Sequence, residues 1–351
     1  MKQLVKGFVL VTFIVIGVSL TEKKCLAAEG MKDSLDLNTI QYTNNGGILS
    51  LENKKDGSME VTFSTKGEVN GYYTTSLISD QAVNVEKKAA IAIHLDTNDA
   101  ISMNVNLMTK EFQTLACKEG TSVYMKADAE RNYELLSVVN GVFEVKKGFL
   151  GTIYIPLASV GSKKELKEVN RFGAIMIQEQ ERETSVTFDS VTLLSAQALP
   201  EQSLKYSYQV MGNKSPMIPG YGEHRYEYQI IDFEDETKHI PYTFSLAHEK
   251  EGVMVSKNGT VTFLENAKPE EVTLSITIDQ SFSVLYTIKP DYSWFMKQEE
   301  ESVRDFIVPQ PYEVASYRSH EYASFDSLIS MVLVTAWLLY LVFYSKKIRK
   351  G

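Results

Sequence analysis

The segment Ile101-Ser102-Met103-Asn104-Val105-Asn106-Leu107 alternates apolar and polar residues without a break. Side chains of a β-strand point to opposite faces in turn, so this pattern predicts a strand with one buried face. Similar segments lie on both sides of it, at residues 59–63, 90–95, 123–125, 142–145, 151–155, 174–177 and 186–193. Turn signals such as Asn140-Gly141 separate them. Short strands without a long helical period predict a β-sandwich over residues 38–196.

The composition also favours β-structure and excludes several classes of protein. The 351 residues include 19 Tyr and 16 Phe, which are both enriched in strands. Two Cys are too few for a disulfide-rich scaffold or a cysteine-only zinc site. The net charge of −9 argues against nucleic acid as a partner. One short helix is expected, because Ser162 and Glu165 form a capping box, and it should end near Asn170.

Three segments in the second half of this region show a family resemblance. They are Gly151–Ser159, which reads GTIYIPLAS, then Phe172–Ile177 after the short helix, and Val186–Leu193, which reads VTFDSVTL. Pro156 suits the end of a strand because it has no N–H to donate. Together the segments resemble the C-terminal half of galactose-binding-like jelly-roll domains, to which many carbohydrate-binding modules of secreted glycoside hydrolases belong. The resemblance implies a jelly-roll sandwich and a glycan ligand.

A second set of alternating segments covers residues 205–290, after a linker at residues 196–204. Within it, Asn258-Gly259 is a signal for a tight hairpin turn. The run Gly252–Phe263, GVMVSKNGTVTF, resembles a hairpin of bacterial immunoglobulin-like and cadherin-like surface domains. The resemblance implies an immunoglobulin-like β-sandwich without the inter-sheet disulfide. The expected ectodomain is therefore all-β.

The first 28 residues are predicted to be a signal peptide. Lys2 and Lys6 precede an apolar run over residues 7–20, and small residues follow near Ala28. The charged residues 22–24 leave an uncleaved N-terminal anchor as the alternative.

A transmembrane helix is predicted at residues 327–345, after a stalk at residues 291–326. Its 17-residue core, from Leu328 to Tyr344, has no charged residue and includes Trp337. The basic tail at residues 346–351 contains Lys346, Lys347, Arg349 and Lys350. By the positive-inside rule these cations place the C-terminus in the cytoplasm. The expected location is a bacterial plasma membrane, crossed once, with the β-domains outside and the bilayer contacted by residues 327–345. A buried core helix is the alternative.

Candidate ligand-binding residues are aromatic and lie near turns of the first sandwich. Flat rings stack against sugar faces, and with no Trp between residues 29 and 293 this role falls to tyrosine. The candidates are Tyr72, Tyr73, Tyr124 and Tyr133. The alternative for each is a packing role. His94, within an apolar strand, is expected to be a core histidine, and the alternative is that it is a ligand.

Asp189 is the best candidate for a metal ligand, because the jelly-roll resemblance implies a structural calcium ion in this region. The alternative is that Asp189 caps a turn. No other cofactor is expected, and no catalytic motif is found in the sequence.

These observations predict a membrane-anchored, non-catalytic extracellular binding protein that recognises a glycan, a cell-wall polymer or a surface protein. The alternative is a structural accessory subunit of a membrane complex for transport, secretion or polymer export. A hydrolase with a hidden site is a third possibility.

Overall fold

The computed structural model describes residues 32–43, 48–64, 73–178, 183–219, 222–268 and 270–292. The chain divides into two compact units, Met1–Met296 and Lys297–Gly351, and all described residues belong to the first. The predicted signal peptide, transmembrane helix and basic tail lie outside these ranges, as does nearly all of the predicted stalk. Among the described residues, no helix is long and apolar enough to span a membrane.

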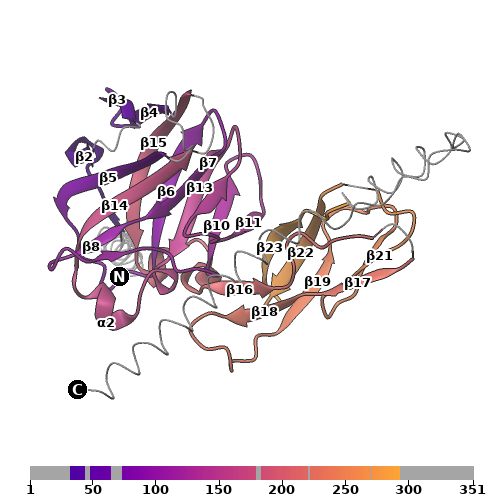
Figure 1. Ribbon diagram of the computed structural model, residues 1–351. Coiled ribbons are helices and arrows are strands. Elements are labelled where there is room, and N and C mark those ends of the chain that lie inside the picture. The colour runs from indigo at the N-terminus through magenta and orange to yellow at the C-terminus, as the bar shows by residue number, and fades with distance from the viewer. Residues whose placement is uncertain are drawn as a thin grey trace, which may run out of the picture. The chain divides into compact units, whose positions relative to one another are not determined.

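Two mainly antiparallel sheets form the N-terminal part of the fold (Figure 1). In the first sheet, the strand order is β3 (Ile48–Asn53), β4 (Met59–Ser64), β15 (Glu183–Leu194), β6 (Ala90–Thr97), β13 (Leu150–Pro156), β10 (Ser122–Ala127) and β11 (Tyr133–Ser137), with β1 (Lys32–Ser34) beside β15. In the second sheet, it is β12 (Phe143–Val145), β7 (Ile101–Val105), β14 (Val169–Gln178), β5 (Tyr73–Ala82) and β2 (Ile40–Thr43). The short strands β8 (Leu107–Thr109) and β9 (Thr114–Leu115) extend the second sheet through β14.

The main hydrophobic core combines the inward-facing side chains of both sheets. Ile91, Ile93 and Leu95 of β6 join Met103 and Val105 of β7 in one buried cluster. Every second residue of these strands enters the cluster, as the alternating sequence predicts. The prediction of an all-β sandwich is confirmed.

Asn104 departs from the simple alternation, because its polar side chain is also buried. Its amide nitrogen donates to the carbonyl oxygens of Cys117 (3.1 Å) and Gly141 (2.8 Å), and its Oδ1 accepts from the Cys117 N–H (3.1 Å). These bonds satisfy both polar atoms of a side chain that is otherwise costly to bury. The Cys117 thiol lies free beside it, and burial raises its pKa to about 12, so it is not a reactive thiolate.

The predicted capping box forms at helix α2 (Lys163–Leu166). Ser162 accepts from the Glu165 N–H, and the Glu165 carboxylate accepts from the Ser162 N–H. The helix is shorter than expected, because Val169 already starts strand β14. Short 3₁₀ turns complete the helical content: η1 (Leu37–Thr39), η2 (Leu157–Ser159), η3 (Ala196–Ala198) and η4 (Gln202–Lys205).

The C-terminal part of the described chain is also built of strands. Three groups are hydrogen-bonded: β16 (Tyr208–Met211) with β18 (Gln229–Asp232); β17 (His224–Glu227) with β21 (Thr260–Phe263) and β20 (Val253–Val255); and β19 (Tyr242–Leu246) with β22 (Val272–Ile278) and β23 (Phe282–Ile288). Their apolar side chains form a second buried cluster.

The two parts share one sheet, which the sequence does not predict. Strand β23 runs parallel to β11, with Tyr133 opposite Val284, so β23, β22 and β19 continue the first sheet. The second cluster also takes in Tyr124 and Leu135 from the outer side of that sheet. The ring of Phe282 lies 5.6 Å from that of Tyr124 and 5.5 Å from that of Tyr133. A continuous apolar contact therefore joins the two parts.

Candidate functional site

The candidate site lies on the side of the first sheet that faces away from the main core, here called the outer face. Strand β6 shows how it arises. Its first four residues are buried, and exposure begins only at His94. Ala90 and Ala92 are covered by the second cluster, which explains why this strand reads as almost continuously apolar. The expectation that His94 is a core histidine is wrong, because its side chain is 26% exposed on the outer face.

A groove runs along the outer face over strands β13, β6 and β15. Strand register aligns Tyr154, Ala92 and Thr192 in one row across these strands. The small side chain of Ala92 leaves a hollow between its two larger neighbours. The groove has a volume of about 490 Å³, and it is lined by Ala92, His94, Thr152, Tyr154, Ser190, Thr192, Leu194, Ala198 and Pro200.

The lining of the groove is suited to a ligand that carries many hydroxyl groups. Thr152, Ser190 and Thr192 contribute alcohol oxygens, each of which both donates and accepts hydrogen bonds. Tyr154 contributes a half-buried ring. Burial raises the pKa of Tyr154, so its phenol keeps its proton and can donate.

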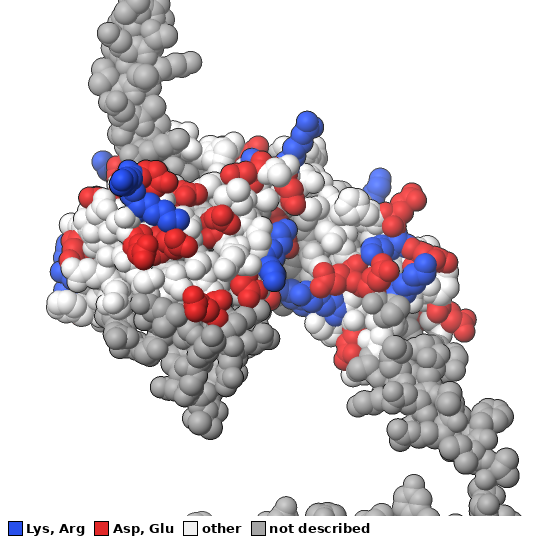
Figure 2. All heavy atoms as spheres, turned by 90° about the horizontal axis from the view of Figure 1, so that it is seen from above, with Lys and Arg blue, Asp and Glu red and all other residues white. Residues whose placement is uncertain are grey.

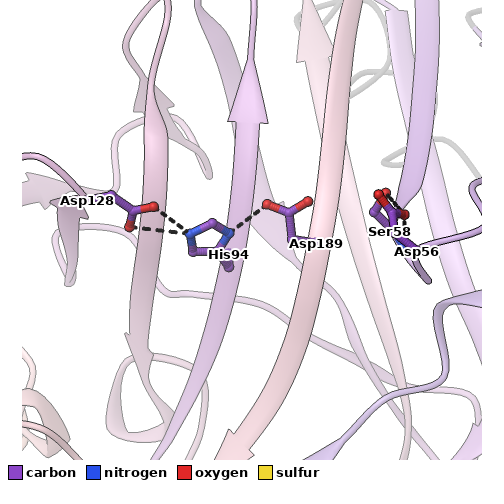
Figure 3. Close-up of polar contacts among 5 residues, drawn as sticks. All are labelled: Asp56, Ser58, His94, Asp128 and Asp189. Atoms are coloured by element: carbon purple, nitrogen blue, oxygen red, sulfur yellow. Dashed lines mark hydrogen bonds and ion pairs between the residues drawn. The ribbon is translucent and has the colours of Figure 1, made fainter.

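One end of the groove carries a row of three ionisable side chains, which we call the carboxylate–histidine row (Figure 3). His94 Nδ1 lies 2.7 Å from Asp189 Oδ2, and His94 Nε2 lies 3.1 Å from Asp128 Oδ2 and 3.3 Å from Asp128 Oδ1. Partial burial lowers the pKa of His94, but hydrogen bonds to Asp128 and Asp189 and the charges of both carboxylates outweigh it. The pKa of His94 therefore lies above the usual histidine value.

A β-bulge brings Asp189 into this row. The register between β15 and β6 shifts between Phe188, opposite Leu95, and Ser190, opposite His94. Because of the extra residue, Asp189 and Ser190 both lie on the outer face while Phe188 stays in the core. Bulges often re-aim side chains in this way beside functional sites.

Calcium binding by Asp189 stays a prediction. In the structure Asp189 bonds to His94 rather than capping a turn. Over the described ranges, no group of three or more His, Cys, Asp or Glu side chains has the geometry to hold a metal ion.

The predicted aromatic residues are not brought together on the outer face. Tyr124 is fully buried, and its hydroxyl donates to the carbonyl oxygen of Tyr206 at 2.8 Å. Tyr133 is only 7% exposed and packs against Tyr154 and Phe282. The structure thus gives these two rings a packing role. Tyr73 is the first residue of β5, but its side chain is outside the described part, and Tyr72 lies outside it entirely.

Five residues of the site were not singled out as site residues from the sequence: Asp128, Thr152, Tyr154, Ser190 and Thr192. Each occupies a polar position in or beside a strand whose alternate residues enter the core, which is the signal available in the sequence. Only the register between strands shows that they meet. Asp and Glu side chains are interspersed with Lys and Arg on the face seen in Figure 2.

Comparisons with known proteins find low-scoring similarities to solved structures but no family. No protein family and no curated protein matches the chain. Among solved structures, it is similar to PfGH50B at a TM-score of 0.33 and 13% identity, over 49% of this chain and 24% of that one. It thus spans about a quarter of that protein.

Two further solved structures are similar to this chain, each over a different fraction of its length. A family 11 carbohydrate-binding module from Clostridium thermocellum, in complex with a β-1,3-1,4-mixed-linked tetrasaccharide, has a TM-score of 0.29 and 13% identity over 47% of this chain and 96% of its own. A β-1,2-glucanase from Parabacteroides distasonis has a TM-score of 0.22 and 13% identity, over 76% of this chain and 38% of its own. Similarities at this level identify no ligand, so the functional argument rests on the residues of the outer face.

Proposed function

We propose that this chain is a non-catalytic glycan-binding protein that holds a sugar chain in the groove of the outer face. The observation that carries the proposal is the groove itself, whose lining combines three alcohol side chains and the half-buried phenol ring of Tyr154 beside two carboxylates. Sugars present hydroxyl groups in several directions, and an open groove with many donors and acceptors matches them. Charge-assisted bonds from sugar hydroxyls to Asp128 and Asp189 would be the strongest of these contacts.

The direct test is affinity electrophoresis of the full-length chain through gels that contain neutral polysaccharides. Mixed-linked β-1,3-1,4-glucan, β-1,2-glucan and agarose form the panel, with purified cell wall tested by sedimentation. We expect saturable retardation without release of new reducing ends. Cleavage of a polymer would contradict the non-catalytic role. A complete lack of binding, together with co-purification of a stable partner in mild detergent, would favour the alternative of an accessory subunit.

Filling the groove should abolish binding. In Thr192→Tyr the new ring lies on the outer face beside Ala92, in a strand that tolerates aromatic residues. We expect at least about a tenfold loss of affinity, because the ligand would lose several hydrogen bonds at once. Thr243→Tyr is the matched control, since Thr243 is exposed on β19 and does not line the groove. Equal binding by both variants would place the ligand elsewhere.

We further propose that residues 327–345 anchor the protein in a membrane, with the described domains displayed outside. The uncharged run from Leu328 to Tyr344 and the cations after it support this proposal. The full-length chain should stay in the membrane pellet after extraction at alkaline pH. Val334→Arg combined with Leu338→Arg should release it, because each arginine costs about 2.5–3.5 kcal/mol near the centre of a span. Lys346→Arg, outside the span, should stay in the pellet, and release of the unaltered chain would refute the anchor.

A further inference from the structure

A second cleft lies where the first sheet continues past the end of the second. Beyond β11 the first sheet goes on into β23 and β22 (Figure 1), whereas in the described part of the chain the second sheet stops at its edge strand β12. On β23, Thr287 points away from the second buried cluster and is partly exposed. Between these elements lies a cleft of about 300 Å³, which we call the junction cleft.

Side chains of both charges line the junction cleft: Glu134, Glu144, Glu271, Lys146, Lys214 and Lys289. Four of them form two ion pairs. Lys146 Nζ lies 3.1 Å from Glu134 Oε2, and Lys289 Nζ lies 3.4 Å from Glu271 Oε1. Among the described residues, Glu144 and Lys214 have no ion-pair partner. The cleft therefore offers one acidic and one basic group to a ligand that carries the opposite charges.

Strand β12 brings an open strand edge to the same place. It is hydrogen-bonded to β7, with Glu144 opposite Ser102, and no described strand lies on its other side. Phe143 and Val145 are buried in the main core, so Glu144 and Ser102 point outward, and both line the junction cleft. An open strand edge presents N–H and C=O groups to which an extended chain can add as a further strand.

We propose that the junction cleft binds a short extended peptide that carries one basic and one acidic side chain, and that this peptide adds to β12 as a strand. The basic side chain pairs with Glu144 and the acidic one with Lys214. A peptide suits the cleft better than a neutral sugar, which has neither the two charges nor a backbone that continues a sheet. The site is separate from the groove of the outer face, because the two share no lining residue.

The binding experiment uses the full-length chain in mild detergent and four sets of fluorescent hexapeptides with alternating Val and Thr. One set carries one Lys and one Glu in every arrangement, and the others carry two Lys, two Glu or no charge. We expect fluorescence anisotropy to show that the best mixed-charge peptide binds about tenfold more tightly than any other, the scale of one hydrogen bond to a charged group. Equal affinity for all four sets, or no binding of any set, would overturn the proposal.

Reversing one charge of the cleft should change which peptides bind. Glu144→Lys leaves two unpaired bases in the cleft, so the peptides with two Glu should become the best binders and the mixed-charge peptides should lose about tenfold in affinity. Glu249→Lys is the matched control, because Glu249 is exposed and does not line the cleft. An unchanged preference in Glu144→Lys, or the same change in Glu249→Lys, would show that the net charge of the protein and not the cleft selects the peptide.

Hydrogen exchange tests the addition of a strand. Saturation with the best peptide should slow the exchange of backbone amides at residues 142–146, because amides at the edge of β12 become hydrogen-bonded. Binding without this protection would overturn the strand addition.

Filling the cleft separates this site from the groove of the outer face. Ser102 is partly exposed on β7, in a strand that tolerates aromatic residues. Ser102→Tyr should abolish peptide binding, while its urea midpoint and its binding of the glucans proposed for the groove stay unchanged. If Ser102→Tyr still binds the peptide, the peptide binds elsewhere and the proposal is wrong.

Discussion

Replacing Phe282 with alanine is expected to lower the free energy of unfolding by about 3–5 kcal/mol, the usual cost of removing a buried phenylalanine ring. Phe282 is 3% exposed and starts strand β23. Its ring touches Tyr124 and Tyr133, which belong to the first sheet of the N-terminal part. The substitution therefore opens a cavity where the two parts of the described chain join.

Urea denaturation of the full-length chain in mild detergent, followed by tyrosine fluorescence, measures this loss. Because the two parts share a sheet and a buried cluster, the unaltered protein should unfold the described strands in one transition. Phe112→Ala is the control, since that side chain is 75% exposed and its loss should change stability by no more than about 0.5 kcal/mol. Two separate transitions in the unaltered protein, with Phe282→Ala shifting only one, would show that the shared cluster does not couple the parts.

The local pattern of the sequence predicts the strands well because each sheet has a buried face. In β7 and β15 the alternation of apolar and polar residues corresponds to core and surface, with Asn104 as an exception that backbone hydrogen bonds explain. The capping box at Ser162 can also be predicted from the sequence, because it depends only on neighbours in the chain.

The candidate site is harder to predict, because it depends on contacts between distant strands. Tyr124 and Tyr133 resemble surface aromatic residues in the sequence, but both belong to the second buried cluster, to which β23 and other C-terminal segments contribute. His94 looks like a core residue because Ala90 and Ala92 before it are covered by the C-terminal part. Asp189 meets His94 through a bulge, which no alternation pattern reveals. In each case the deciding neighbour lies far away in the sequence.

Gly259→Ala should cost about 3 kcal/mol or more, for two separate reasons. Gly259 follows Asn258 in the turn before β21 and has a φ of 96°, a conformation that residues with a Cβ rarely adopt. A Cβ added there would also overlap the carbonyl oxygen of Tyr228 and press on the ring of Phe244. The Gly259 carbonyl oxygen accepts from the Tyr228 N–H at 2.9 Å. The backbone at Gly259 therefore cannot move away from Tyr228 without breaking this bond.

Gly57→Ala separates the two causes. Gly57 has a similar φ of 90°, but an added Cβ would meet no heavy atom within 4 Å. The free energy of unfolding of this variant should fall only by the cost of placing alanine at a positive φ, about 1 kcal/mol. Urea midpoints of both variants, measured on the full-length chain, give the comparison. Equal losses would mean that the backbone near Tyr228 yields freely, whereas a larger loss for Gly259→Ala would show that the turn is held by the strands packed around it.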